Sequence, residues 1–166
     1  MILADFRPSP NFDERPPGAA VDVIVIHNIS LPPGEFGGPH IEELFQNRLH
    51  PGAHPYFAGI AALKVSAHFL IRRDGQVIQF VDTDKRAWHA GVSNWNGRER
   101  VNDFSIGIEM EGTDDVAFED AQYQALNALL AELRGKYGPV PLTGHSQIAP
   151  GRKTDPGPSF DWGRLG

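Results

Sequence analysis

The stretch VDVIVIH, Val21 to His27, decides the fold of this chain. Its residues are β-branched and almost continuously apolar, a pattern typical of a strand that is buried on both faces of a sheet. The stretch ends at His27 and Asn28, so polar side chains follow where the buried strand stops. We therefore expect a sheet in the core, with His27 at a strand end where it can face a site.

A second strand is predicted at Phe104 to Glu111, FSIGIEME, where apolar residues alternate with small or acidic ones. Glu109 then lies on the face opposite the apolar side chains. If that face is exposed to solvent, Glu109 is an ordinary surface carboxylate. If it lies under a cleft, the small Ser105 and Gly107 leave room, and Glu109 becomes a candidate general base.

A β-hairpin is predicted from Lys64 to Arg73 and from Gln76 to Val81, joined by the two-residue turn Asp74-Gly75. A histidine inside an apolar strand is more often a hydrogen-bonded core residue than a ligand, and we expect that role for His68. Regular alternation would place His68 and Leu70 on one face, and on the other Val65, Ala67, Phe69 and Ile71.

The main helix is predicted at Glu119 to Tyr137, because leucines recur at spacings of three and four residues and Gly135 and Gly138 mark its end. Pro39 to Leu49 predicts a shorter helix. Pro139 to Thr143 predicts one more short strand. This order of elements indicates helices and strands arranged around one sheet.

The totals fit a single globular domain. The chain has 166 residues, of which 40 % are hydrophobic and 22 % charged, enough for one core and too few for two. Residues 1–20 lack periodicity and contain four prolines, so we interpret them as an arm. Residues 21–166 are then one domain of the α/β or α+β class.

Charge and cysteine content exclude several function classes. The net charge is −6 and no dense basic stripe is present, which argues against a nucleic-acid partner and, more weakly, against an anionic membrane surface. The chain has no cysteine, so disulfides and cysteine-based zinc sites are excluded. The N-terminus lacks the apolar core of a signal peptide and no stretch reaches membrane-spanning length, from which we expect a cytosolic protein.

The segment Gly144 to Trp162, GHSQIAPGRKTDPGPSFDW, holds the densest chemistry of the chain. It is too irregular for a helix or a long strand, and loops on a rigid scaffold commonly carry catalytic groups. With His27, its residues His145 and Asp155 make two histidines and a carboxylate, a sufficient ligand set for catalytic zinc. The alternative is a satisfied loop histidine and a turn-forming aspartate, so residue types alone leave the metal open.

Neighbouring residues restrict the backbone conformation of this segment. Gly144 allows close backbone approach next to His145, and Pro156 favours an extended backbone at Asp155. On an extended segment Lys153 points the same way as Asp155, and its ammonium could stabilise an oxyanion beside a metal. It is equally consistent with a solvated loop lysine.

Aromatic and basic residues cluster in the irregular segment from Thr83 to Arg100. It contains Trp88, His89, Trp95 and Arg100. Aromatic side chains on a loop often line a ligand groove, but tryptophan also pins loops to a core. Both interpretations remain open on these residues alone.

Five stretches of the sequence resemble the type 2 N-acetylmuramoyl-L-alanine amidases. They are VIVIHNISLPPGEFGG, VSAHFLIRRDGQVIQFV, RAWHAGVS, GRERVNDFSIGIEMEGTD and GHSQIAPGRKTDPGPSFDW, and the match runs from about Pro8 to Trp162. That family shares its fold with phage T7 lysozyme and with peptidoglycan-recognition proteins. The resemblance therefore implies a central mixed β-sheet flanked by helices.

The resemblance also implies roles for individual residues. The zinc ligands of the family fall on His27, His145 and Asp155, and its catalytic residues on Glu109 and Lys153. Its substrate-groove positions fall on Asn28, Lys64, Trp88, His89, Ala90 and Arg100. Lys64 departs from relatives that carry arginine there, which keeps the charge but loses the two-pronged donor for a carboxylate.

The activity that the resemblance implies is that of a cytosolic zinc amidase. It would hydrolyse the amide between 1,6-anhydro-N-acetylmuramic acid and L-Ala of the stem peptide in cell-wall recycling, with consequences for β-lactamase induction. The expected partner is an anhydro-muropeptide, with no nucleic acid and no membrane, and the expected state is a monomer. The alternatives are a peptidoglycan-recognition module that binds muropeptide without cleavage, and an amidase that acts on intact peptidoglycan.

Overall fold

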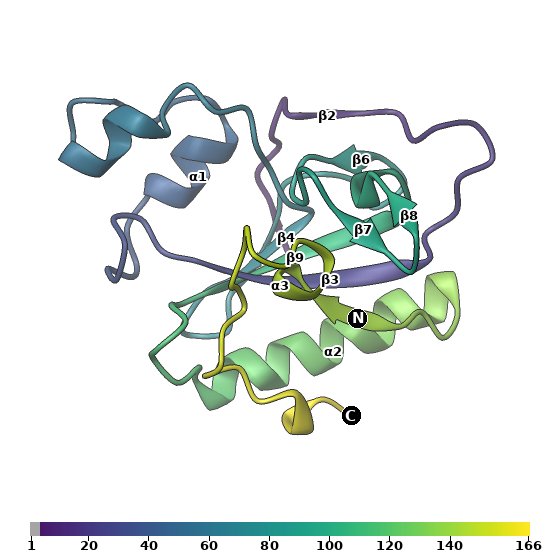
Figure 1. Cartoon of the computed structure of the whole chain (residues 1–166). Coiled ribbons are helices and arrows are strands. Elements are labelled where there is room, and N and C mark those ends of the chain that lie inside the picture. Colours follow the sequence, from purple (N-terminus) through teal and green to yellow (C-terminus); the bar gives the residue numbers. More distant parts are fainter. Residues whose placement is uncertain (1–3) are drawn as a thin grey trace.

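A six-stranded sheet forms the centre of the protein (Figure 1). The computed structural model describes residues 4–166. The strands lie in the order β1-β5-β4-β9-β3-β10, and all neighbours are parallel except β4 and β5. Their bounds are Asp5–Phe6 (β1), Val77–Gln79 (β5), Phe69–Ile71 (β4), Ser105–Glu111 (β9), Val23–Ile29 (β3) and Leu142–Gly144 (β10). The expected central mixed sheet is confirmed.

Strand β3 is buried on both faces, as its sequence predicts. Ile24 and Ile26 pack in one core cluster, while Val23 and Val25 pack in another on the opposite side of the sheet. The strand begins two residues later than the apolar pattern suggested, because β3 pairs with β9 from Val23 through Ile29. His27 therefore lies inside the strand rather than at its last residue.

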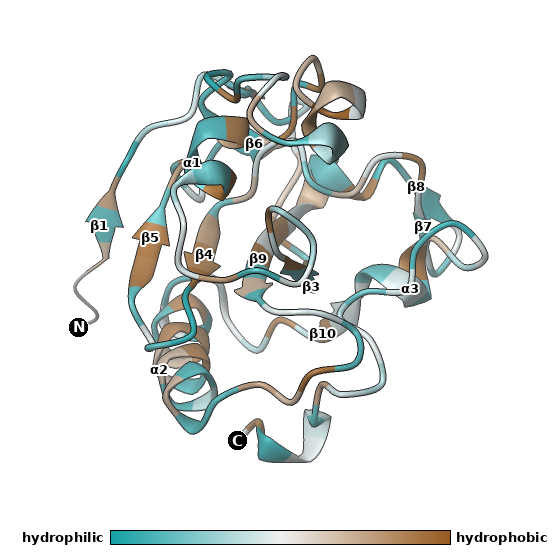
Figure 2. Cartoon of the chain, turned by 90° about the vertical axis from the view of Figure 1, so that its left-hand side faces the viewer, coloured by the Kyte–Doolittle hydropathy of each residue, from teal (hydrophilic) through white to brown (hydrophobic). Residues whose placement is uncertain are grey.

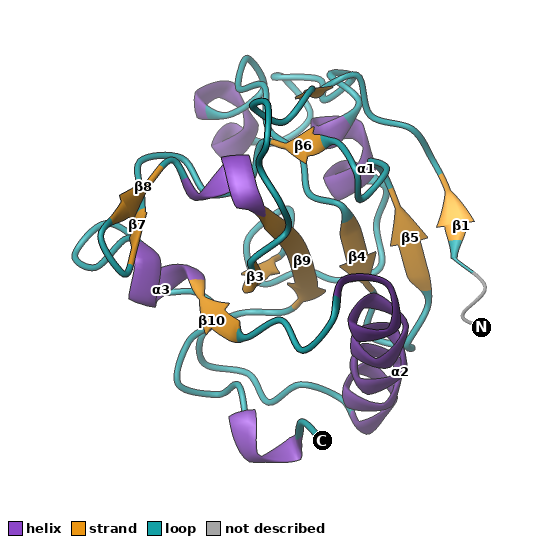
Figure 3. Cartoon of the chain, turned by 90° about the vertical axis from the view of Figure 1, so that its right-hand side faces the viewer, coloured by secondary structure: helices purple, strands orange, loops and turns teal. Residues whose placement is uncertain are grey.

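The long helix α2, Asp120–Tyr137, covers one face of the sheet (Figures 1 and 3). It begins at a capping box formed by Glu119 and Gln122 and ends at Gly138, whose φ of 86° suits glycine. Its apolar stripe packs with the apolar side chains of β9, so the larger core lies between helix and sheet. Figure 2 shows hydrophobic residues along α2 and along β4 and β5. This stripe consists of Tyr123, Leu126, Leu129, Leu130 and Leu133.

A second core lies on the other face, under the short helices α1, His40–Phe45, and η1, Pro55–Gly59. Helix α1 ends four residues before the predicted boundary. Asn47 adopts a left-handed φ of 58°, and its side chain exchanges hydrogen bonds with that of Asn11 from the N-terminal arm. Leu49 nevertheless packs in this core, which is why the sequence pattern continued past the helix.

The hairpin is confirmed but shorter than predicted, and the prediction for one face was wrong. Strands β4 and β5 pair antiparallel, but Ile71 is opposite Val77, so the turn contains three residues, Arg73 to Gly75, instead of the expected two; Gly75 takes a φ of 89° in it. Phe69 and Ile71 face α2, but Ala67 packs with Leu70 on the opposite side. The alternation resets because Ser66 leaves the β4 ladder to donate its N–H to the Trp88 carbonyl.

His68 is a hydrogen-bonded core residue, as predicted. It is fully buried, its Nε2 donates to the carbonyl of Lys85 at 2.9 Å, and its Nδ1 accepts the N–H of Gly107 at 3.1 Å. Burial is the main reason that the pKa of His68 falls to about 3. Both ring nitrogens are therefore occupied by backbone groups.

Short elements complete the fold. Within residues 4–166, no helix combines the length and apolar character that crossing a bilayer requires. The segment Gly144 to Trp162 contains a one-turn helix, α3 at His145–Ile148, where we expected no helix. The remaining elements are β2 (Phe12–Asp13), β6 (Arg86–Ala87), β7 (Asn94–Trp95), β8 (Arg98–Glu99), η2 (Val101–Phe104) and η3 (Trp162–Arg164).

Candidate functional site

Three neighbouring parallel strands, β9, β3 and β10, bring titratable residues together near their carboxyl-terminal ends. His27 of β3 is in register with Glu109 of β9, so their side chains emerge side by side on the same face. His145 directly follows β10, whose last residue, Gly144, pairs with Ile26. The carboxyl ends of parallel strands are a common place for ligand sites in sheets of this kind.

His27, His145 and Asp155 come together as a cluster that could hold a metal ion. The two Nδ1 atoms are 2.9 Å apart, and they lie 3.1 and 3.2 Å from the Asp155 Oδ2. Ligand atoms on a tetrahedral zinc with bonds of about 2.0–2.1 Å are separated by roughly 3.3 Å. The three residues proposed from sequence therefore converge at a spacing close to that of a zinc site.

The hydrogen bonds and charges around the three residues also suit a cation. The His145 Nε2 donates to the Ala90 carbonyl at 2.9 Å, which leaves the Nδ1 lone pair free. Burial lowers the pKa of His27 despite the hydrogen bond with Asp155, so its neutral form is favoured. Burial acts to raise the pKa of Asp155, but hydrogen bonds with His145 and His27 outweigh it and keep the pKa low. Neutral imidazoles and an ionised carboxylate are the forms that bind zinc.

The loop that carries Asp155 is fastened on both sides. Gly144 allows it to fold back, since a Cβ there would stand 2.9 Å from Pro156 Cδ. Asp114 accepts hydrogen bonds from Asn28 at 2.7 Å and from the Thr154 hydroxyl. Asn28 also donates to the carbonyl of Pro156 at 3.0 Å. The carboxylate of Asp155 is thus held by contacts on each side of it in the chain.

Glu109 lies under a cleft, which is the second of the two cases that its sequence left open. It is 8 % exposed, and its Oε1 is 3.8 Å from the His27 Nδ1. Among the described residues, its buried Oε2 has no hydrogen-bond partner. Burial raises the pKa of Glu109 well above its ordinary value, and the negative charge of Asp155 adds to the shift while Lys153 opposes it.

The cleft above these residues has a volume of about 670 Å³, within the range of small-molecule sites. Lys153 is exposed on its rim, on the loop before Asp155. Tyr56, Ile60 and Leu63 form an apolar wall on the side of η1. The cleft therefore combines a buried acidic and histidine-rich floor, an apolar wall and a basic rim.

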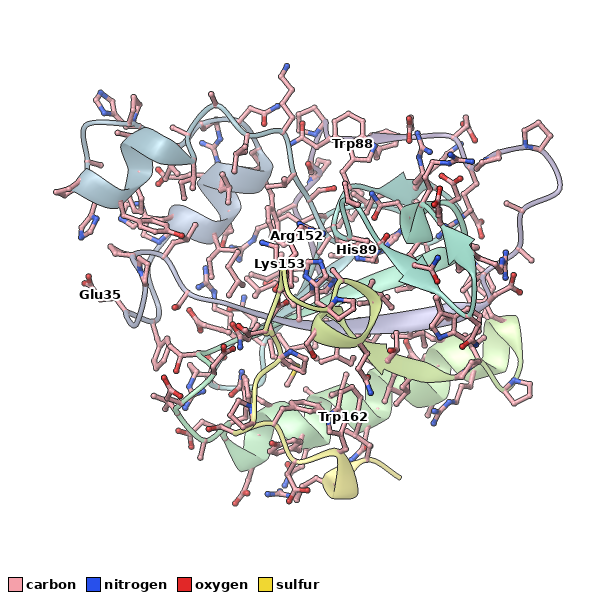
Figure 4. The ribbon with its side chains drawn as sticks, viewed as in Figure 1. Glu35, Trp88, His89, Arg152, Lys153 and Trp162 are labelled. Atoms are coloured by element: carbon pink, nitrogen blue, oxygen red, sulfur yellow. The ribbon has the colours of Figure 1, made fainter. Side chains whose placement is uncertain are left out.

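The residues that the family resemblance placed in the substrate groove fall into three sets. Asn28, Trp88 and His89 line the cleft. Figure 4 labels Trp88 and His89 together with the rim residue Lys153. Lys64 and Arg100 are exposed but do not line it, and Arg100 instead lines a neighbouring cavity of about 460 Å³. Ala90 is fully buried, and it contacts the site through its carbonyl oxygen, which accepts a hydrogen bond from the His145 Nε2.

Three residues that the sequence analysis did not assign also shape the site. Asp114 fastens the Asp155 loop, and the Ser105 hydroxyl lies 2.9 Å from the His89 Nε2. Arg152 donates to the carbonyls of Ala90 and Val92, both at 2.7 Å. The sequence gives a signal for Ser105 alone, since it is a small polar residue on the Glu109 face of β9. Asp114 and Arg152 act on partners more than 39 positions away.

This chain is similar to known proteins over almost its whole length. Residues 17–158 match the family described as N-acetylmuramoyl-L-alanine amidase. The 1,6-anhydro-N-acetylmuramyl-L-alanine amidase AmpD of Citrobacter freundii is 63 % identical over 167 residues, covering 98 % of this chain and 89 % of that protein. A crystal structure of a selenomethionine AmpD derivative is 60 % identical, with a TM-score of 0.97 over 99 % of this chain and 93 % of that one.

One similar structure contains a ligand. It is the complex of the N-acetylmuramyl-L-alanine amidase AmiD of Escherichia coli with the substrate anhydro-N-acetylmuramic acid-L-Ala-D-γ-Glu-L-Lys. It is 30 % identical, with a TM-score of 0.64 over 92 % of this chain and 59 % of that one.

Proposed function

This chain belongs to the N-acetylmuramoyl-L-alanine amidase family, and on that premise we propose that it is a zinc-dependent amidase of anhydro-muropeptides. It hydrolyses the amide between 1,6-anhydro-N-acetylmuramic acid and L-Ala of the stem peptide. The observation that carries the proposal is the convergence of His27, His145 and Asp155 on the cleft beside the buried Glu109.

In this proposal His27, His145 and Asp155 hold the zinc. A zinc ion supplies Lewis acidity there, which polarises a carbonyl group and lowers the pKa of a water molecule. The bonds from His145 to Ala90 and from Asn28 to Pro156 keep the ligands aimed at one point.

Glu109 carries the proton. Its carboxylate lies on the floor of the cleft, 3.8 Å from the nearest ligand atom of His27. It accepts a proton from the attacking water and delivers it to the nitrogen of the leaving L-Ala, so the amine departs in neutral form. Burial favours this role because a carboxyl with a raised pKa is a stronger base than an exposed one.

Lys153 stabilises the negative charge that develops on the former amide oxygen. It is on the rim of the cleft, and its positive charge acts on Glu109 and on His27. An ammonium at this position favours the tetrahedral intermediate over the planar amide. The stem peptide carries carboxylates, and the exposed Lys64 and Arg100, although they do not line the cleft, supply positive charge that attracts it to an otherwise acidic protein.

We assign the reaction to cell-wall recycling in the cytoplasm, with a monomeric protein that lowers β-lactamase induction where the signal is an anhydro-muropeptide. This rests on similarity to AmpD proteins along almost the whole chain. The substrate of the AmiD complex is the ligand that we expect in the cleft.

Mass spectrometry of the products tests the function. Incubation with anhydro-N-acetylmuramyl tripeptide should release free tripeptide and anhydro-N-acetylmuramic acid, and a chelator should abolish release until zinc is restored. His27→Ala should retain no bound zinc and no activity. Binding of the muropeptide without products would identify a recognition module instead. Faster cleavage of intact sacculus than of anhydro-muropeptide would instead identify an amidase that acts on intact peptidoglycan.

A further inference from the structure

His89 makes contacts that its expected place in a substrate groove does not explain. Its ring is nearly perpendicular to that of His27, at 89°, and its Nδ1 lies 2.9 Å from the His27 Nε2. Its own Nε2 lies 2.9 Å from the Ser105 hydroxyl. Both ring nitrogens are therefore already hydrogen-bonded inside the protein, and the side chain is only 9 % exposed.

The protein builds a specific space for this ring. Gly107 of β9 lies directly beneath it, and a Cβ at that position would stand 2.4 Å from the His89 Cγ. The Asn102 side chain accepts the backbone N–H groups of His89 and Ala90, at 3.1 and 2.8 Å. Ring and backbone are fixed together, so the ring is held in place before any ligand arrives.

The contact between the His89 Nδ1 and the His27 Nε2 bears on which nitrogen of His27 carries the proton. His27 can bind a metal through Nδ1 only if that atom keeps its lone pair, which requires the proton on Nε2. The competing tautomer places the proton on Nδ1, where the Asp155 Oδ2 at 3.1 Å can accept it. An acceptor at the His27 Nε2 therefore favours the metal-binding tautomer, and the His89 Nδ1 is placed to be that acceptor.

Ser105 completes the chain of hydrogen bonds. When the His89 Nδ1 accepts, its proton resides on Nε2 and is donated to the Ser105 hydroxyl. The next residue, Ala90, does the corresponding task for the second ligand, since its carbonyl accepts from the His145 Nε2. Two consecutive residues thus orient both histidine ligands, one through its side chain and one through its backbone.

We propose that His89, supported by Ser105, is a positioning residue that holds His27 in the tautomer able to bind the metal, and that its ring does not bind substrate. The proposal rests on the metal site proposed above. It predicts that changes at His89 act first on metal affinity and only through it on turnover.

Zinc affinity, measured by competition with a chromophoric chelator, tests the assignment. His89→Leu removes the acceptor and should weaken zinc binding by about 10–100-fold, the usual effect of losing a hydrogen bond to a ligand histidine. His89→Asn should recover most of the affinity, because its Oδ1 occupies the position of the imidazole Nδ1. Ser105→Ala should weaken binding in the same direction by a smaller factor.

Gln122→Leu is the matched control. Gln122 is fully buried and donates to the carbonyls of Ile71 and Glu111, on the α2 side of the sheet. Its replacement removes buried hydrogen bonds without touching the site, so zinc affinity should stay unchanged. Near-ultraviolet circular dichroism and cooperative thermal unfolding establish that each variant is folded. If His89→Leu does not fold, the zinc affinity of Ser105→Ala tests the proposal instead. An unchanged zinc affinity in Ser105→Ala would then overturn the positioning role of His89.

The outcomes separate this proposal from the function on which it rests. A folded His89→Leu protein with unchanged zinc affinity overturns the assignment, and an increase in KM at unchanged affinity makes His89 a substrate contact. Equal weakening in Gln122→Leu reduces the effect to general destabilisation. Absence of zinc binding by the unsubstituted protein removes the metal site itself.

Discussion

Replacing Glu109 by glutamine tests two separate properties of this residue, its role in proton transfer and its effect on the stability of the fold. The residue is 8 % exposed, and within residues 4–166 its Oε2 has no hydrogen-bond partner. Glutamine has almost the same shape but cannot accept the proton of a water. Glu109→Gln should therefore lower turnover by about 10²–10⁴, the range for loss of a general base, while the bound zinc, measured by mass spectrometry, stays at the wild-type level.

The same substitution should stabilise the metal-free protein at neutral pH. Burial, with the Asp155 charge, raises the pKa of Glu109 above its ordinary 4.5. A raised carboxyl pKa contributes stability below the unfolded pKa, and this contribution is lost as the pH rises through the folded pKa. Removing the ionisable group should then stabilise the protein at neutral pH by about 1.4 kcal/mol for each unit by which folding raises the pKa, or roughly 2–4 °C in Tm per kcal/mol.

Thermal unfolding in the presence of a chelator, repeated from pH 4 to pH 8, measures this effect. The difference between Glu109→Gln and wild type should grow with pH and vanish below about pH 4.5, near the ordinary glutamate pKa. Glu99→Gln, which changes an exposed carboxylate of β8, is the control and should shift Tm little. Wild-type turnover in Glu109→Gln would refute the proton-transfer role. A variant less stable than wild type at pH 7 would refute the argument from burial.

Three further predictions follow from the site and its supports. Lys153→Ala should lower kcat by about 10²–10³, the effect of losing one oxyanion donor, with zinc retained; near-normal kcat would contradict its role. Asp114→Ala releases Asn28 and Thr154, so zinc affinity should fall about tenfold while exposed Asp115→Ala leaves it unchanged, and equal affinities would show that the loop needs no such anchor. His68, whose pKa burial lowers from 6.5 to about 3, stays neutral in the fold, so its stabilising contribution is lost as the pH falls below 6.5. Urea unfolding should show a slope from this group of up to about 1.4 kcal/mol per pH unit between those values; an unaltered slope in His68→Gln would contradict it.

Local sequence patterns predicted the parts of the site that depend on strands. The apolar run before His27 predicted a buried strand, and the alternation around Glu109 predicted a strand whose second face was left open; the parallel pairing of β3 with β9 brought the two residues together. The fold class and the main helix followed from periodicity for the same reason, since these signals repeat within a few residues. The assignment of zinc ligands needed the family resemblance, because two histidines and an aspartate fit many arrangements.

Long-range supports were beyond the reach of those patterns. Asp114 holds a loop 40 residues further along, and no feature near it in the sequence marks that contact. The exact end of α1 depends on Asn11 reaching Asn47 across 36 positions. The family resemblance placed His89 in the substrate groove, whereas its hydrogen bonds to His27 and Ser105 appear only once the sheet is formed.

The cluster of His27, His145 and Asp155 joins segments from the two ends of the chain. His27 is separated from His145 by 118 positions and from Asp155 by 128. During synthesis the ribosome releases His27 long before the other two, so a growing chain cannot hold the metal at this site. A bound ion would also act as a cross-link that closes a very long loop, the kind of closure that restricts the unfolded chain most. If the proposed site is correct, metal binding and amidase activity would both require a chain that has been synthesised through Asp155 and has folded.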